Sequence, residues 1–185
     1  MTMEKMVKGS IIMDLIRIIR GTKDERLVRY FTEEQKKILS EKIIPSGWYP
    51  VDLHRQSLLA IYEVFGQKKP ETAREWGKTF GEKIIAQSYK SLINPGDPRG
   101  TLKNFSRVSK TFFNYDYLEV VASEEKKVQF RTLFENSPAA IAFSYLLAGW
   151  LEKMVELSGG LAPKVEVSLP RLEAGQATGF VITWD

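Results

Sequence analysis

Apolar residues recur at helical spacing through the first 113 residues of the chain. In the segment "GSIIMDLIRIIR", residues 9–20, Ile11, Leu15, Ile18 and Ile19 fall on one face of a helix. Comparable stripes predict further helices, and these cover residues 24–31, 32–42, 53–65, 70–93 and 99–113. The chain is therefore predicted to have a helical N-terminal half.

Local signals place the ends and the contacts of these helices. Thr32 and Gln35 have the spacing of a capping box at the start of 32–42. Asp52 is a natural N-cap for 53–65, because its carboxylate can accept backbone N–H bonds at the positive helix end. Gly77 and Gly81 lie four residues apart within 70–93, and two glycines there favour close approach of another backbone.

The period of the pattern changes after residue 113. Residues 117–123 and 126–134 are predicted to form two strands, the second with alternating residues, and "KVEVSL" and "TGFVITWD" form two more at the end of the chain. A strongly apolar helix over 138–158 lies between the two pairs, and "PRLEAGQA", 170–177, is the expected turn in the second pair. The order β-β-α-β-β predicts an α+β fold with a four-stranded antiparallel sheet and a buried helix.

The length fits a single domain over 1–185, with a helical half at 1–113 and the sheet with its buried helix at 114–185. The 27 Lys and Arg residues alternate with 23 Asp and Glu residues, and the net charge is +4. No stripe of basic residues forms, so we expect no nucleic-acid partner. The chain has no cysteine and one histidine, which excludes disulfides, zinc–cysteine sites and sites of several imidazoles within one chain.

Membrane and secretion signals are also missing from the pattern. The longest apolar run, 138–151, has 14 residues, whereas a transmembrane helix needs about 20. The apolar stretch near the N-terminus is interrupted by Asp14, Arg17 and Arg20, and it resembles a helix rather than a signal peptide. A soluble cytoplasmic protein is the expectation.

Candidate chemistry concentrates in "SGWYPVDLHRQSLLAIYEVFG", residues 46–66. Trp48 and Tyr49 could line a pocket for a flat or acyl ligand, or could fill the space between a loop and the core. His54 could be a heme or metal ligand or a general base, or a polar side chain near a helix start. The sequence leaves both pairs of alternatives open and favours the structural one in each.

The order of elements, together with "SGWYP" at 46–50 and "GFVITWD" at 179–185, resembles an uncharacterised bacterial family best known from myxobacteria. More distantly, residues 8–185 are similar to a superfamily of four-vinyl-reductase domains, heme-nitric-oxide-binding domains and TRAPP vesicle-tethering subunits. This resemblance implies a module that binds a small molecule or a partner, rather than a catalyst.

The chain departs from the patterns that the resemblance implies for cofactors. Heme-nitric-oxide-binding domains use a histidine on a helix after the midpoint and a Tyr-x-Ser-x-Arg motif. Here the histidine is at position 54, "YKSLI" at 89–93 lacks the arginine, and "YLLAG" at 145–149 lacks both the serine and the arginine. The cysteines of four-vinyl-reductase domains and the acylated cysteine of TRAPP subunits have no counterpart, although an apolar cavity remains compatible with the sequence.

We therefore expect a non-catalytic domain that binds a small apolar ligand or acts as a sensor, forms a homodimer and carries no cofactor. No Gly-rich phosphate loop or Gly-x-Ser-x-Gly motif is present. The ligand is expected between the helical half and the sheet, and the predicted site residues are Trp48, Tyr49, His54, Phe105 and Tyr145. One alternative is a protein-interaction scaffold with a filled core, and another is a heme or metal gas sensor built on His54.

Overall fold

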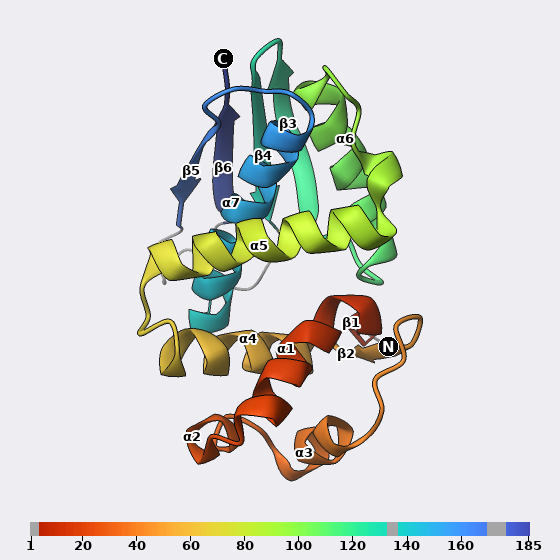
Figure 1. Ribbon diagram of the computed structural model, residues 1–185, viewed down its shortest axis with the longest axis vertical. Coiled ribbons are helices and arrows are strands. Elements are labelled where there is room, and N and C mark those ends of the chain that lie inside the picture. The colour runs from red at the N-terminus through yellow and green to blue at the C-terminus, as the bar shows by residue number, and fades with distance from the viewer. Residues whose placement is uncertain (1–3, 133–136, 170–176) are drawn as a thin grey trace. The chain divides into compact units, whose positions relative to one another are not determined.

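The computed structural model describes residues 4–132, 137–169 and 177–185. The chain forms two compact units (Figure 1). Unit 1 comprises Met1–Lys69 and Lys110–Tyr115, and unit 2 comprises Pro70–Ser109 and Asp116–Asp185. The α5 and α6 helices described below therefore group with the sheet rather than with the N-terminal helices. The organisation of 1–185 as a single domain stays a prediction.

Unit 1 is built from short strands and helices around one apolar core. Its elements are β1 (Met6–Lys8), α1 (Gly9–Thr22), α2 (Glu25–Val28), α3 (Glu33–Ser40), β2 (Trp48–Pro50) and α4 (Val51–Val64). The β1 and β2 strands pair antiparallel, with Val7 opposite Tyr49, and Val7 also bridges to Phe113. The apolar faces of α1 and α4 pack together, and their fully buried side chains include Ile12, Ile16, Leu53 and Leu58.

The capping box predicted at the start of α3 is confirmed. The Thr32 hydroxyl accepts from the Gln35 backbone N–H at 3.2 Å, and the Gln35 side chain accepts from the Thr32 N–H at 3.0 Å. These two bonds satisfy donors that a helix start would otherwise leave without partners.

The predicted Asp52 cap is wrong. Strand β2 runs directly into α4, so the helix already begins at Val51, with Pro50 in the N-cap position and no side-chain cap. Asp52 lies in the first turn, where its carboxylate accepts from Arg55 at 3.0 Å. Its negative charge still faces the positive end of the helix dipole, which is favourable without a capping bond.

Unit 2 contains the predicted sheet and its helices. Its elements are α5 (Pro70–Ser88), η1 (Lys90–Leu92), α6 (Pro98–Val108), β3 (Leu118–Glu124), β4 (Lys127–Thr132), α7 (Pro138–Leu157), β5 (Lys164–Ser168) and β6 (Thr178–Thr183). A further 3-10 turn, η2 (Ser109–Thr111), follows α6 at the junction of the two units. The described residues form the predicted four-stranded antiparallel sheet, in the order β3-β4-β6-β5. The α+β fold class is therefore confirmed.

Two predicted features fall partly outside the described residues. These are the end of the second strand at 133–134 and the turn at 170–177, of which only Ala177 is described. The helix predicted over 70–93 ends at Ser88, and the 3-10 turn η1 follows it.

One face of the sheet carries the core of unit 2. Phe130 of β4 pairs with Phe180 of β6, and Val165 of β5 pairs with Ile182 of β6, and all four side chains are buried. Figure 1 shows α7 lying against this sheet and α5 crossing over α7. Because α7 is apolar around most of its circumference, it is buried on both sides.

The crossing of α5 and α7 confirms the close approach predicted from the glycines. A Cβ atom on Gly77 would overlap the backbone carbonyl of Leu146, and one on Gly149 would overlap the carbonyl of Arg74. At Gly81 a Cβ would lie 3.2 Å from the Trp150 ring. The two helix backbones can therefore approach to this distance only because both partners lack a side chain at the contact.

Candidate functional site

Tyr49 anchors a loop within unit 1. Its hydroxyl oxygen accepts from the Ile44 backbone N–H at 2.8 Å. Its ring packs so closely on the loop and on α1 that a Cβ on Gly47 or Gly9 would lie 3.1 or 3.0 Å from Cε2. This position matches the structural role that the sequence favoured for Tyr49, while a role in ligand binding stays a prediction.

Trp48 lies on the surface of unit 1. Its side chain is 42% exposed, and the Lys8 ammonium lies 4.0 Å from the ring centroid. Lys8 Nζ also donates to the Ser46 carbonyl at 3.0 Å. The cation–π contact and this bond hold the indole in place while leaving much of it exposed to solvent.

His54 is buried on the core side of α4. It is 4% exposed, and its ring meets Phe113 edge-on at 5.9 Å. Burial lowers the pKa of His54 to about 4, with a smaller contribution from the positive charge of Arg55. The imidazole is therefore neutral at physiological pH.

This burial makes the stability of the protein depend on pH. The imidazole titrates near 6.5 when the chain is unfolded but at about 4 in the fold, so the unfolded chain binds the proton first. The contribution of the neutral His54 to the free energy of unfolding is complete above pH 6.5 and is lost as the pH falls toward 4. We expect the free energy of unfolding to fall by about 1 kcal/mol between pH 6 and pH 5 from this group alone.

Urea denaturation of the wild type and His54→Gln at several pH values measures this contribution. Glutamine is neutral at every pH, so the variant should lose the pH dependence between 6.5 and 4 that carboxylates do not explain. An identical slope in both proteins would contradict the assignment.

The other two predicted site residues lie in unit 2. Phe105 of α6 is 1% exposed, and its ring centroid lies 5.9 Å from that of Trp150 on α7. Tyr145 is half-buried on α7, one and a half turns before Trp150. The structure thus places Trp48, Tyr49 and His54 in unit 1 and Phe105 and Tyr145 in unit 2.

A buried ionic cluster in unit 2 was not predicted from the sequence. The Glu152 carboxylate on α7 is 6% exposed and accepts from Arg74 of α5 through both oxygens, with Nε at 3.0 Å. Lys78 Nζ lies 3.4 Å from the same carboxylate, and Arg74 Nη2 also donates to the Val165 carbonyl of β5 at 2.9 Å. The hydrogen bond to Glu152 raises the pKa of Arg74. The cluster links α5, α7 and β5. The one indication of it in the sequence was an acidic residue, Glu152, within the strongly apolar segment that forms α7.

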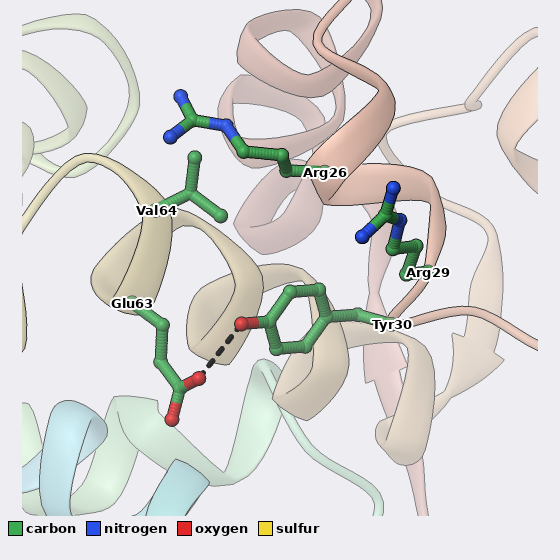
Figure 2. Close-up of a pocket in the computed structure, with 5 residues that line it drawn as sticks. All are labelled: Arg26, Arg29, Tyr30, Glu63 and Val64. Atoms are coloured by element: carbon green, nitrogen blue, oxygen red, sulfur yellow. Dashed lines mark hydrogen bonds between the residues drawn. The ribbon is translucent and has the colours of Figure 1, made fainter.

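A pocket of about 430 Å³ opens on the surface of unit 1, between α2 and α4 (Figure 2). It is lined by Arg26, Arg29, Tyr30, Glu63 and Val64. The Tyr30 hydroxyl donates to Glu63 Oε2 at 2.7 Å, and this bond is the main cause of the raised pKa of Tyr30. This pocket was not predicted from the sequence, although the spacing of Arg26 and Arg29 places both on one side of a helical turn.

Across 4–132, 137–169 and 177–185, no group of three or more His, Cys, Asp or Glu side chains could hold a metal ion. Among these residues, no helix has the length and apolar character needed to cross a membrane.

Solved structures of H-NOX proteins resemble this chain in fold over nearly its whole length. The Fe(II) unliganded H-NOX protein from K. algicida matches with a TM-score of 0.62 and 13% identity, over 96% of each chain. A mutant T. tengcongensis H-NOX protein matches with a TM-score of 0.64 and 15% identity, over 96% of this chain and 97% of that one. A structure that probes heme distortion in the H-NOX family matches with a TM-score of 0.61 and 16% identity, over 96% and 94%.

These matches show that the chain has the H-NOX fold, and they confirm the predicted similarity to heme-nitric-oxide-binding domains at the level of fold. No protein-family model and no curated protein matches the sequence.

The residues of this chain do not fit a heme held by histidine or cysteine. Protein ligands to heme iron include imidazole and thiolate groups. The chain has no cysteine, and α6, the helix after the midpoint, carries no histidine. The imidazole of His54 is enclosed in the core of unit 1 against Phe113. The fold is therefore present without the histidine that the family resemblance implies.

Proposed function

We propose that this protein is a non-catalytic ligand-binding or sensory domain that works as a homodimer without a histidine-ligated heme. One observation carries the proposal. The chain has the H-NOX fold over 96% of its length, yet its histidine is buried in α4 and α6 has none. Because the chain has the H-NOX fold but lacks a histidine placed to bind heme iron, we propose that it binds a molecule other than a histidine-ligated heme.

An apolar molecule is the ligand class we propose. Aromatic side chains are well suited to the walls of an apolar site. Within unit 2, Phe105 and Tyr145 are the residues proposed to contact it, and within unit 1 the corresponding candidates are Trp48 and Tyr49. Acid–base catalysis by imidazole would depend on His54, the one histidine of the chain. Because His54 is buried and its pKa is low, the imidazole stays neutral and enclosed, which supports a binding role rather than catalysis.

Native and denaturing mass spectrometry of the freshly purified protein tests this function, with an absorbance scan before and after addition of hemin. We expect a native mass of twice the chain, an extra mass that is lost on denaturation, and no stoichiometric Soret band after unbound hemin is removed. His54→Ala is the matched variant, and it should leave the spectrum and the retained mass unchanged. A stoichiometric Soret band that shifts in His54→Ala would overturn the proposal in favour of a heme sensor.

A second candidate is a protein-interaction scaffold, and the surface around Trp48 favours it. Ile44 is 55% exposed and Trp48 is 42% exposed, although their loop is firmly held. Gly9 N–H donates to the Gly47 carbonyl and Ser10 N–H to the Pro45 carbonyl, both at 2.9 Å. Exposed apolar side chains that form a contiguous patch are typical of interaction surfaces. A clean native mass without retained ligand would favour this alternative.

A further inference from the structure

We propose that the pocket between α2 and α4 of unit 1 binds a small organic anion, a carboxylate or phosphate monoester with a short apolar body. This site is separate from the apolar-ligand site of the proposed function and does not depend on it.

Arg29 supplies an uncommitted positive charge. Its side chain is exposed at the C-terminal end of α2, and within the described residues the guanidinium makes no ion pair or hydrogen bond. Guanidinium groups bind carboxylates and phosphates through two parallel N–H bonds, which favours these anions over neutral ligands.

Arg26 supplies further donors from another side of the pocket. Its Nε and Nη2 donate to the Asp24 carboxylate at 3.0 and 2.7 Å, which orients the guanidinium plane. These bonds leave the Nη1 donors available, because a guanidinium carries five N–H groups. Figure 2 shows the two guanidinium groups on different sides of the pocket, with the Arg26 group above Val64.

Glu63 is the carboxylate that would repel an anion, but its charge is already compensated. Its Oε2 accepts from Tyr30 at 2.7 Å, and its Oε1 lies 3.3 Å from Lys68 Nζ. Asp24 is paired with Arg26 in the same way. Three cations (Arg26, Arg29 and Lys68) against two carboxylates (Asp24 and Glu63) leave one positive charge, and it is that of the unpaired Arg29.

The remaining wall of the pocket explains why the anion should be organic. Val64 contributes an apolar side chain, and the Tyr30 ring is held at the pocket by its bond to Glu63 (Figure 2). The volume of about 430 Å³ lies in the range of small-molecule sites. A bare anion would leave this apolar surface uncovered, whereas a short hydrocarbon or aromatic body would contact it.

Isothermal titration of the full chain with phenyl phosphate, inorganic phosphate, benzoate and the neutral analogue phenol tests the site. We expect saturable binding of phenyl phosphate and benzoate, weaker binding of inorganic phosphate, and none of phenol. Binding should weaken as the salt concentration rises. Arg29→Gln should weaken phenyl phosphate binding about tenfold, the loss expected for one charged hydrogen-bonding group.

Arg17→Gln is the matched control, because Arg17 is an exposed arginine of the same unit and pairs with Asp14 at 2.9 Å. It should change phenyl phosphate binding by less than about twofold, as expected of an exposed charge outside the site. Circular dichroism verifies that both variants are folded, and neither side chain belongs to the core. Absence of saturable binding by the wild type, or equal losses in the two variants, would overturn the proposal. Failure here leaves the hemin and mass-spectrometry results of the proposed function unaffected.

Discussion

Replacing Gly77 with alanine should lower the free energy of unfolding by about 2 to 3 kcal/mol, which is a typical cost of overpacking a tight interior contact. The new Cβ would overlap the backbone carbonyl of Leu146 on α7. A backbone atom cannot rotate away as a side chain can, so the two helices must separate. Separation would loosen the reciprocal contact at Gly149 and the packing of Trp150 on Gly81. This cost exceeds the gain of about 1 kcal/mol in helix propensity on exchanging glycine for alanine.

Gly21→Ala is the matched control for this prediction. Gly21 is also helical, in α1, but a Cβ there meets nothing within 4 Å. The substitution should therefore stabilise the protein by about 0.5 to 1 kcal/mol through propensity alone. Urea denaturation followed by circular dichroism measures both variants. If Gly77→Ala were as stable as Gly21→Ala, the tight crossing of α5 and α7 would be wrong.

The periodicity of apolar residues predicted most of the fold. Residues in β4 and β6 are buried in alternation, and α7 is buried over most of its surface. Both burial patterns are visible in the local order of apolar and polar residues. The β1–β2 pair was missed, because strands of three residues are too short to show alternation. The start of α4 was predicted two residues too late, because Asp52 has a strong preference for the N-cap position. In the structure the chain passes directly from Pro50 into the helix, which begins at Val51.

The candidate sites were less predictable than the fold, because they depend on residues that are distant in sequence. Arg74 and Glu152 lie 78 positions apart, and Tyr30 and Glu63 lie 33 apart. Only the packing of α5 on α7, and of α2 on α4, brings these partners together. Missing residue types can be counted directly in the sequence, so the lack of cysteine and the single early histidine already argued against the cofactors of the superfamily. The burial of His54 adds a structural reason.

Replacing Arg74 with methionine should be the other strongly destabilising change, with a loss of about 3 kcal/mol, as expected when one partner of a buried ion pair is removed. The Glu152 carboxylate, 6% exposed, would keep Lys78 at 3.4 Å as its one counter-charge among the described residues. The bond from Arg74 to the Val165 carbonyl would also be lost, which disconnects α5 from the sheet edge. Methionine retains much of the length and apolar surface of the arginine stem, so the loss reports charge and hydrogen bonding rather than a cavity.

The control for this prediction is Arg131→Met. Arg131 donates to Glu119 at 2.7 Å between β4 and β3, but the two side chains are 51% and 48% exposed. An exposed pair of this kind contributes about 0 to 1 kcal/mol, and high salt screens it. The double variant Arg74→Met with Glu152→Leu should recover most of the lost stability, because it removes the buried charge that the single variant leaves behind. Equal losses in Arg74→Met and Arg131→Met would show that the buried cluster does not hold α5, α7 and β5 together.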